Sequence, residues 1–470
     1  MAKRPGAFSI GALLGSVLAA VIIVWLLIGS AELPREAAFM GGIFVLATLL
    51  WVTEALPLFA TSLLVLGLEV VLLANPGEWD GLGFETAEPV GYRQFIAAAA
   101  DPILLLFFGG FLLARAAVNE GVDQAMSALL LRPFGRKPRM ILLGLMCVTA
   151  LFSMWMSNTA TTAMMITLVA PMVARLPPED RFRKGLFLCV PFAANIGGMG
   201  TPISSPPNAV AVGYLAKLGT PVTFLQWMLI GVPLMIVLIL FAWELLWRLH
   251  RPAGDDLPIE TVRRPLTRRS WFVAGVFSVT VLLWMTDQLH GLPASVVALL
   301  PAVAFTATGM LRREDVNSLD WHILILIAGG IVLGFGIQRT GLDEIFVGWL
   351  PLDRGISALL VIAVLVIATL LLSTFMSNTA AANLLLPIGV STATALGGGA
   401  LITDVAISIA LTSAVAMALP ISTPPNAIAY GAGGLTVKDM ARTGAIIGIV
   451  AALAILFVGR LAVRLSGAAP

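Results

Sequence analysis

Charged residues are scarce in this chain of 470 residues. Only 11% of the residues are Asp, Glu, Lys or Arg, whereas soluble proteins carry about a quarter, and 59% are hydrophobic. Uncharged runs such as residues 5–31 and 185–216 each supply the roughly 20 apolar residues that a membrane-spanning helix needs. We therefore expect an all-α polytopic membrane protein in the lipid bilayer. The formal net charge is only +2, so nucleic acid is not expected as a partner.

Cysteine and histidine are also rare, and this limits the chemistry available to the chain. Its two cysteines, Cys147 and Cys189, lie in apolar runs, so we expect buried free thiols and neither a disulfide nor a thiolate metal site. The three histidines are scattered near predicted helix ends. A metal-dependent hydrolase therefore has almost no ligands to draw on.

The basic residues that are present form four clusters, at residues 132–139, 181–184, 248–269 and 312–313. Because Lys and Arg mark cytoplasmic loops, these clusters and an amino terminus with Lys3 and Arg4 are expected on the cytoplasmic side of the inner (plasma) membrane. The segment 75–101 is acidic instead and is expected outside. The first apolar run is longer than a signal peptide and lacks a clear cleavage site, so the protein is expected to cross the membrane several times from its first helix.

Two uncharged stretches do not fit simple spans. Residues 140–174 are flanked by basic clusters on both sides, so both of their ends are expected in the cytoplasm. This stretch is too long for one span and short for two, which favours a re-entrant hairpin over a pair of tight spans. Residues 355–403 form a second such stretch, and we expect this hairpin to enter from outside.

The same polar triplet lies at the midpoint of each stretch, as Ser157-Asn158-Thr159 and Ser377-Asn378-Thr379. The offset of 220 residues between them also relates Gly109-Gly110 to Gly329-Gly330. An offset of 218 relates the motif that ends at Asn208 to the motif that ends at Asn426, both with Pro-Pro-Asn. These matches predict two repeats of inverted topology. This is the architecture of secondary transporters, whose sites lie at the repeat interface near the membrane midplane.

The repeated motifs suggest sites for ions. Ser, Asn and Thr are favoured helix N-caps, so each triplet is expected to start a half-helix whose N-terminus can hold a carboxylate. Prolines interrupt the Pro-Pro-Asn helices and expose backbone carbonyls at membrane depth, where hard oxygen ligands suit Na⁺. Ser153 and Ser373 precede the triplets by one turn and can add hydroxyl ligands. Neither hairpin core contains Lys or Arg, so a bound dianion needs a co-bound cation.

Other interpretations of these residues are weaker. A single Ser-Asn-Thr usually joins membrane helices, but its duplication at two hairpin midpoints favours a site. Glu54 and Asp287 each lie near a helix end, where capping is favoured over proton coupling. An intramembrane serine hydrolase using Ser157 or Ser377 lacks a His or Lys in the hairpins to act as base, so we do not expect an enzyme. A passive channel is the other rival.

Over nearly its whole length, from Trp51-Val-Thr53-Glu54 to the last helix, the chain resembles the divalent anion/sodium symporter family of di- and tricarboxylate carriers. The resemblance implies about eleven transmembrane helices plus two re-entrant hairpins, a homodimer and an elevator mechanism. It implies a scaffold of residues 1–131 (helices 1–4) and 270–350 (helices 7–9). The transport domain would comprise residues 138–248, with the inward hairpin and helices 5–6, and residues 355–465, with the outward hairpin and helices 10–11.

The resemblance also assigns site residues. It implies substrate binding by the two triplets together with Thr423 and Pro424. It implies one Na⁺ site at Ser153, Ser157, Asn158 and the backbone around Ser204, and a second at Ser373, Asn378 and the backbone around Ser422. One departure is Ser204-Ser205 before the first Pro-Pro-Asn, where similar proteins have Gly-Thr/Ser, and this puts the first cation site in doubt.

The expected function is import of a small C4-dicarboxylate such as succinate, malate or fumarate, coupled to Na⁺. A Na⁺-independent dicarboxylate exchanger, or citrate or sulfate as substrate, are the alternatives.

Overall fold

The computed structural model describes residues 10–29, 33–84, 90–254, 266–348, 357–459, 463–464 and 467. Every regular element in these ranges is helical, which confirms the fold class expected from the composition. The charges at Lys3, Arg4, Glu85, Glu88 and Arg354, which contributed to the predicted topology, lie outside the described residues.

Within these ranges, seven segments are long and apolar enough to cross a membrane. They are α1 (Ile10–Gly29), α2 (Arg35–Thr53), α4 with α5 (Tyr92–Asn119), α11 (Phe224–Leu249), α17 (Trp321–Arg339), α19 (Ala358–Phe375) and α23 with its π-helical end (Val437–Phe457). The protein is therefore a multi-pass membrane protein.

After α1, the helices fall into two halves in which the long helices, the hairpin and the interrupted helix follow one another in the same order. The first half contains α2, α3 (Leu58–Leu68), the π-helix η1 (Glu69–Leu73), α4 (Tyr92–Ala99), α5 (Ile103–Asn119), α6 (Val122–Leu131), η2 (Arg132–Phe134), α7 (Pro138–Ser153), α8 (Asn158–Ala174), α9 (Phe182–Gly197), α10 (Pro206–Lys217) and α11. The second half contains α12 (Arg268–Met285), α13 (Asp287–His290), α14 (Ala294–Val297), α15 (Leu299–Ala307), α16 (Arg313–Asn317), α17, α18 (Leu342–Gly348), α19, α20 (Asn378–Ala395), α21 (Ala400–Ala414), α22 (Pro424–Gly431), α23 (Val437–Ala454) and η4 (Ile455–Gly459).

Each half has a helical hairpin, then an interrupted helix, then a final long helix. The hairpins are α7–α8 and α19–α20, and the interrupted helices are α9–α10 and α21–α22. When α3 with η1, α4 with α5, α14 with α15 and each interrupted helix are taken as single spans, the described residues give eleven spans and two hairpins. This agrees with the number that the family resemblance implies.

Glycines allow the closest contacts between these elements, and both repeated Gly-Gly pairs contribute to them. A Cβ on Gly109 would lie 2.5 Å from the carbonyl oxygen of Ala298, and a Cβ on Gly329 would collide with Ser62. The segments 198–205 and 415–423, which interrupt α9–α10 and α21–α22, are called here the first and second break. Gly231 of α11 and Gly444 of α23 lie equally close to the carbonyl oxygens of Met199 and Met417 in these breaks. Only a residue without a side chain permits backbone approach of this kind, so the final helix of each half fixes a break in place.

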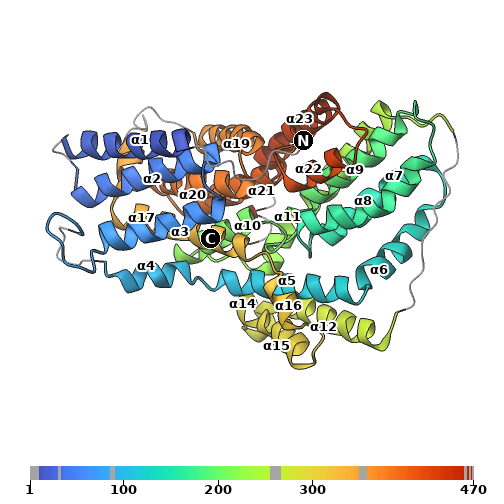
Figure 1. Cartoon of the computed structure of the whole chain (residues 1–470), viewed down its shortest axis with the longest axis horizontal. Helices are drawn as coiled ribbons and strands as arrows, with labels where there is room; N and C mark the ends of the chain where they lie inside the picture. The colour runs from blue at the N-terminus through green and yellow to red at the C-terminus, as the bar shows by residue number, and fades with distance from the viewer. Residues whose placement is uncertain are drawn as a thin grey trace.

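Figure 1 shows how the two halves are arranged. Helices α1 to α4 gather with α17 at one end of the long axis, and α6 to α9 lie toward the other end. Between them, α10, α20 and α21 pack against one another, which brings the first interrupted helix against the second hairpin.

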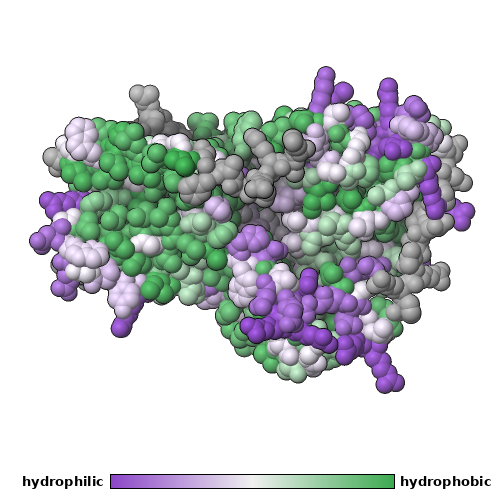
Figure 2. Space-filling model, viewed as in Figure 1, coloured by the Kyte–Doolittle hydropathy of each residue, from purple (hydrophilic) through white to green (hydrophobic). Residues whose placement is uncertain are grey.

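The face shown in Figure 2 is largely hydrophobic over α1 to α4. It is hydrophilic at the two ends of the long axis and near α16. Large apolar side chains on α1, such as Leu14, Leu18 and Trp25, are exposed to the surroundings, as expected for a helix in contact with lipid.

Candidate functional site

The first triplet forms the tip of hairpin α7–α8. The Ser157 hydroxyl accepts a hydrogen bond from the Ala160 backbone N–H at 3.2 Å, so Ser157 is the N-cap of α8. Three residues separate the end of α7 from this cap, and α8 begins at Asn158. The tip therefore presents the positive end of a helix dipole and a half-buried Asn158 amide.

The second triplet has the same local structure. The Ser377 hydroxyl accepts from the Ala380 N–H at 3.2 Å and caps α20, which begins at Asn378. Both N-caps expected from the sequence are confirmed. The two tips differ in their surroundings, because Thr159 is exposed whereas Thr379 is buried with 7% exposure.

The two Pro-Pro-Asn motifs end the breaks in matching ways. Prolines 206 and 424 occupy the first turn of α10 and α22, where a missing N–H costs nothing. The Asn208 amide donates to the carbonyl oxygen of Thr201, and the Asn426 amide donates to that of Leu419, both at 2.9 Å. A side-chain amide thus satisfies backbone carbonyls that the interrupted helix leaves free.

Ser204 and Ser422 also occupy corresponding positions in the breaks. The Ser204 hydroxyl accepts from the Thr201 N–H at 3.3 Å, and the Ser422 hydroxyl accepts from the Leu419 N–H at 3.1 Å. Each hydroxyl also lies against backbone carbonyls, at 2.7 Å from the Gly198 oxygen for Ser204 and at 2.7 Å from the Thr374 oxygen for Ser422. Ser204, where similar proteins have Gly, therefore adds a hydroxyl whose hydrogen bonds lie within the first break.

Three oxygen atoms converge beside the first tip. The Ser153 Oγ lies 2.6 Å from Asn158 Oδ1 and 2.7 Å from the Ala194 carbonyl oxygen. A hydroxyl has one proton and can donate to only one of these acceptors. A Cβ on Gly198 would lie 2.6 Å from the Asn158 Nδ2, so this glycine makes room for the amide. The cluster joins hairpin α7–α8 to the end of α9.

The corresponding atoms beside the second tip are unsatisfied. Ser373 Oγ and Asn378 Oδ1 are both buried and have no hydrogen-bond partner among the described residues. Buried polar atoms nearly always have a partner, so these two oxygens call for a ligand or water.

Asn195 connects the two halves, and its role was not predicted from the sequence. From α9, the Asn195 amide donates to Thr423 Oγ1 and to Asn426 Oδ1, each at 3.1 Å, and it is buried with 1% exposure. Thr423 is buried beside it, whereas Pro424 is exposed. The signal for this role that the sequence offered was that Asn195 is a polar residue in the uncharged run before the first break.

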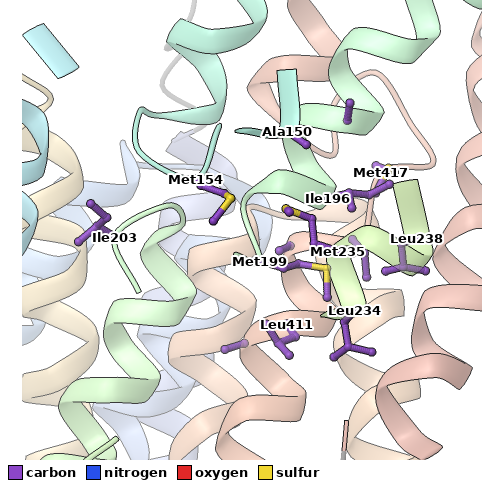
Figure 3. Packing of buried hydrophobic residues seen from close by; sticks show 14 of the residues in the cluster. Ala150, Met154, Ile196, Met199, Ile203, Leu234, Met235, Leu238, Leu411 and Met417 are labelled. Carbon is purple, nitrogen blue, oxygen red and sulfur yellow. The ribbon is translucent and has the colours of Figure 1, made fainter. Parts of the chain in front are cut away.

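Apolar side chains surround these polar contacts. Figure 3 shows Ile196, Met199, Met235 and Met417 gathered where α9 and α21 are interrupted. All four belong to one buried cluster that also contains residues of α7 and α11. The first break is buried along its length, whereas Ile421 in the second break is 74% exposed, so this packing shields the polar contacts of the first break and strengthens them.

The two acidic residues near helix ends differ. Asp287 is the first residue of α13, and its Oδ1 is buried without a hydrogen-bond partner among the described residues, so the expected capping contact is not seen there. Glu54 is exposed and has a left-handed conformation (φ 49°) at the end of α2, as expected for a helix terminus. Cys147 and Cys189 are free thiols, but only Cys189 is buried as expected, whereas Cys147 is half-buried. In the described part of the chain, no three His, Cys, Asp or Glu side chains gather as metal ligands.

Over residues 12–465, the chain matches the family described as the sodium:sulfate symporter transmembrane region. The chain belongs to the divalent anion/sodium symporter family. It is therefore a membrane transport protein and not an enzyme, in agreement with the sequence-based expectation.

Relatives in this family are similar over most of their length. An uncharacterized transporter of Haemophilus influenzae is 32% identical, over 91% of this chain and 92% of the relative. The sodium-dependent dicarboxylate transporter SdcS of Staphylococcus aureus is 30% identical, over 97% of this chain and 92% of the relative.

Two solved transporter structures share the fold of this family member. The YdaH transporter of Alcanivorax borkumensis has a TM-score of 0.60 at 14% identity, covering 90% of this chain and all of that one. The MtrF efflux pump of Neisseria gonorrhoeae has a TM-score of 0.53 at 11% identity, covering 87% of this chain and 94% of that one.

Proposed function

We propose that this transporter imports C4-dicarboxylates such as succinate, malate or fumarate, coupled to Na⁺. The observation that carries the proposal is the pair of capped half-helices, α8 and α20, that begin at identical triplets. The name of the related sodium-dependent dicarboxylate transporter supports the same substrate class and coupling ion.

In this proposal, each helix N-terminus holds one carboxylate of the substrate. Backbone N–H groups at the start of a helix, together with the dipole, favour a bound anion. The hydroxyls and amides of the two triplets would supply the side-chain donors, with Thr423 and Pro424 beside them. Neither hairpin core contains a cationic side chain, so the charge of a dianion is left for a co-transported cation to neutralise.

Oxygen ligands for Na⁺ are available beside both tips. At the first, Ser153, Asn158 and the Ala194 carbonyl already converge, with Ser157 and the backbone around Ser204 nearby in the proposed site. At the second, the unsatisfied oxygens of Ser373 and Asn378 would be ligands, together with the backbone around Ser422. Hard cations prefer such neutral and backbone oxygens, and interrupted helices bind them in transporters.

The transport step would be an elevator movement within a homodimer. The scaffold would comprise residues 1–131 and 270–350, and the moving domain would comprise residues 138–248 and 355–465. The amino terminus would be cytoplasmic and the membrane would be the inner (plasma) membrane. Support comes from the hydrogen bonds that tie the two interrupted helices to each other and to both hairpins, so that these elements can move as one body.

Uptake of labelled succinate into proteoliposomes, with an inward Na⁺ gradient or with choline in its place, tests the proposal. We expect uptake that requires Na⁺ and is lost in Asn378→Ala. The matched control is Asn119→Ala, because Asn119 is a surface residue outside both hairpins. Uptake that ignores Na⁺ but needs internal dicarboxylate would show an exchanger instead. Inhibition by citrate or sulfate, and not by malate or fumarate, would assign another substrate.

A further inference from the structure

Glu69 is one of several acidic side chains that are buried in the described part of the chain, and it lies away from both hairpin tips. Glu69 begins the π-helical turn η1 at the end of α3, and its side chain has 0% exposure. Neither of its carboxyl oxygens has a hydrogen-bond partner among the described residues. Single π-helical turns are frequent at functional sites, and acidic residues inside membrane helices are costly enough to suggest a function.

The surroundings of Glu69 come from three helices. A Cβ on Gly336 of α17 would lie 2.9 Å from Glu69 Cδ and 2.7 Å from Met40 Sδ of α2, so the carboxyl group lies against a backbone and a thioether. The hydroxyl of Tyr214, on α10, lies against Gly334, which like Gly336 belongs to α17. That hydroxyl is also buried without a hydrogen-bond partner in the described structure, and it lies within electrostatic reach of Glu69.

The cation that acts on Glu69 is Lys217, at the end of α10. Its Nζ lies 3.8 Å from Asp101 Oδ2, and its side chain is 30% exposed. Lys217 therefore already has a carboxylate partner in Asp101. Asp343 of α18 is a further charge that acts on Tyr214. The other titratable or charged side chains on the helices packed against α3 and η1 are Arg35 and Glu36 of α2, Tyr92 and Arg93 of α4, and His322 and Arg339 of α17.

An ionised carboxylate in this position would have neither a hydrogen bond nor a contact ion pair. Such a group takes up a proton, because burying the bare charge costs far more than protonation. We propose that Glu69 is a proton-binding site where α3 and η1 meet α17 and α10.

Proton release would change the partners in this cluster. A carboxylate at Glu69 would attract the Lys217 ammonium, which would then have to leave Asp101. If the proposed domain division holds, α3 and α17 belong to the scaffold and α10 to the moving domain. Asp101 also lies in the scaffold, so Lys217 would join the two domains in either state, through Asp101 while Glu69 is protonated and through Glu69 after proton release. This pH-dependent change of partner, unlike the proton site itself, rests on the proposed function.

Infrared spectroscopy of the purified protein detects the proton directly. At neutral pH we expect the wild type to show the C=O stretch of a protonated carboxylic acid, and Glu69→Gln to lose that component. The matched control is Glu244→Gln, since Glu244 is ion-paired to Arg139 and Arg248 at 2.7 Å and should contribute no protonated band. In Lys217→Met, the Glu69 component should persist to higher pH, because the cation that favours ionisation is gone. Identical wild-type and Glu69→Gln spectra in this region would overturn the proposal.

Succinate uptake provides a second measurement. Above the pH range in which an ordinary carboxyl group titrates, wild-type uptake should change as Glu69 releases its proton, whereas Glu69→Gln uptake should stay constant. If no substrate is transported under any condition, the proposed function fails while the infrared result still decides the proton site. An unchanged pH profile in Glu69→Gln would contradict the coupling of this proton to transport.

Discussion

The side-chain amide of Asn195 donates hydrogen bonds to both Thr423 and Asn426, each at 3.1 Å. Asn195 lies on α9 in the first half of the chain, and its two partners begin α22 in the second half. The Asn426 amide in turn donates to the carbonyl oxygens of Met417 and Leu419. One buried side chain therefore holds the second break in register with the first interrupted helix.

Replacing Asn195 by Ala should weaken both stability and transport. The change leaves Asn426 Oδ1 without its donor in a buried position, which costs about 1–3 kcal/mol. We expect a lower thermal midpoint and a higher KM for succinate, since Thr423 and α22 lose their support. Asn195→Asp should be worse than Asn195→Ala, because a carboxylate has no proton to donate to either acceptor. Equal midpoints and uptake in Asn195→Ala and wild type would show that this bridge is not needed.

The local structure of the hairpin tips could be predicted from the sequence. Ser157 and Ser377 are good N-caps, and the charges around residues 140–174 favoured a hairpin over a pair of tight spans, so short-range rules were sufficient. The breaks followed in the same way from their prolines.

Substituting Ser157 separates capping from binding. Ser157→Ala removes the acceptor for the Ala160 N–H and should cost about 1 kcal/mol of stability, whereas Ser157→Gly costs only a few tenths. If the hydroxyl binds substrate or Na⁺, both variants should lose Na⁺-driven uptake to a similar extent. Recovery of uptake in Ser157→Gly alone, measured in the same proteoliposomes, would mean that the serine serves only as a cap.

Long-range partners could not be predicted in this way. Asn195 is one polar residue in an uncharged run, and nothing local indicates that it meets Thr423 more than 200 positions later. Glu69 was missed for a related reason. A lone acid near a helix end usually faces water, and only the packing of α17 against α3 shows that this one is buried.

Gly198 should be sensitive to the smallest possible enlargement. Its backbone is helical (φ −60°), so alanine is not strained there, but the new Cβ would lie 2.6 Å from Asn158 Nδ2 and 3.1 Å from Asn158 Oδ1. The amide must then shift, which disturbs the contact between Asn158 Oδ1 and Ser153 Oγ. We expect Gly198→Ala to raise the Na⁺ concentration for half-maximal uptake at least several-fold. Gly275→Ala on α12 is the control, since no atom lies within 4 Å of its added Cβ. A Na⁺ dependence that is the same in both variants would argue against Asn158 as an ion ligand.

The contact between α16 and α5 should make a small, pH-dependent contribution to stability. Asp315 accepts from Arg115 Nε at 3.3 Å and from Asn119 Nδ2 at 2.8 Å, and the Arg312 backbone N–H, with these side chains, lowers the pKa of Asp315. Because the carboxylate is favoured in the folded state, its contribution is present above the ordinary pKa of about 4 and is lost as the pH falls through the lowered value. For this partly exposed pair, Asp315→Asn should cost about 0.5–1 kcal/mol at pH 7, and the difference in thermal midpoint should shrink as the pH is lowered below about 4. A difference that stays constant over this range would show that the ion pair is not its source.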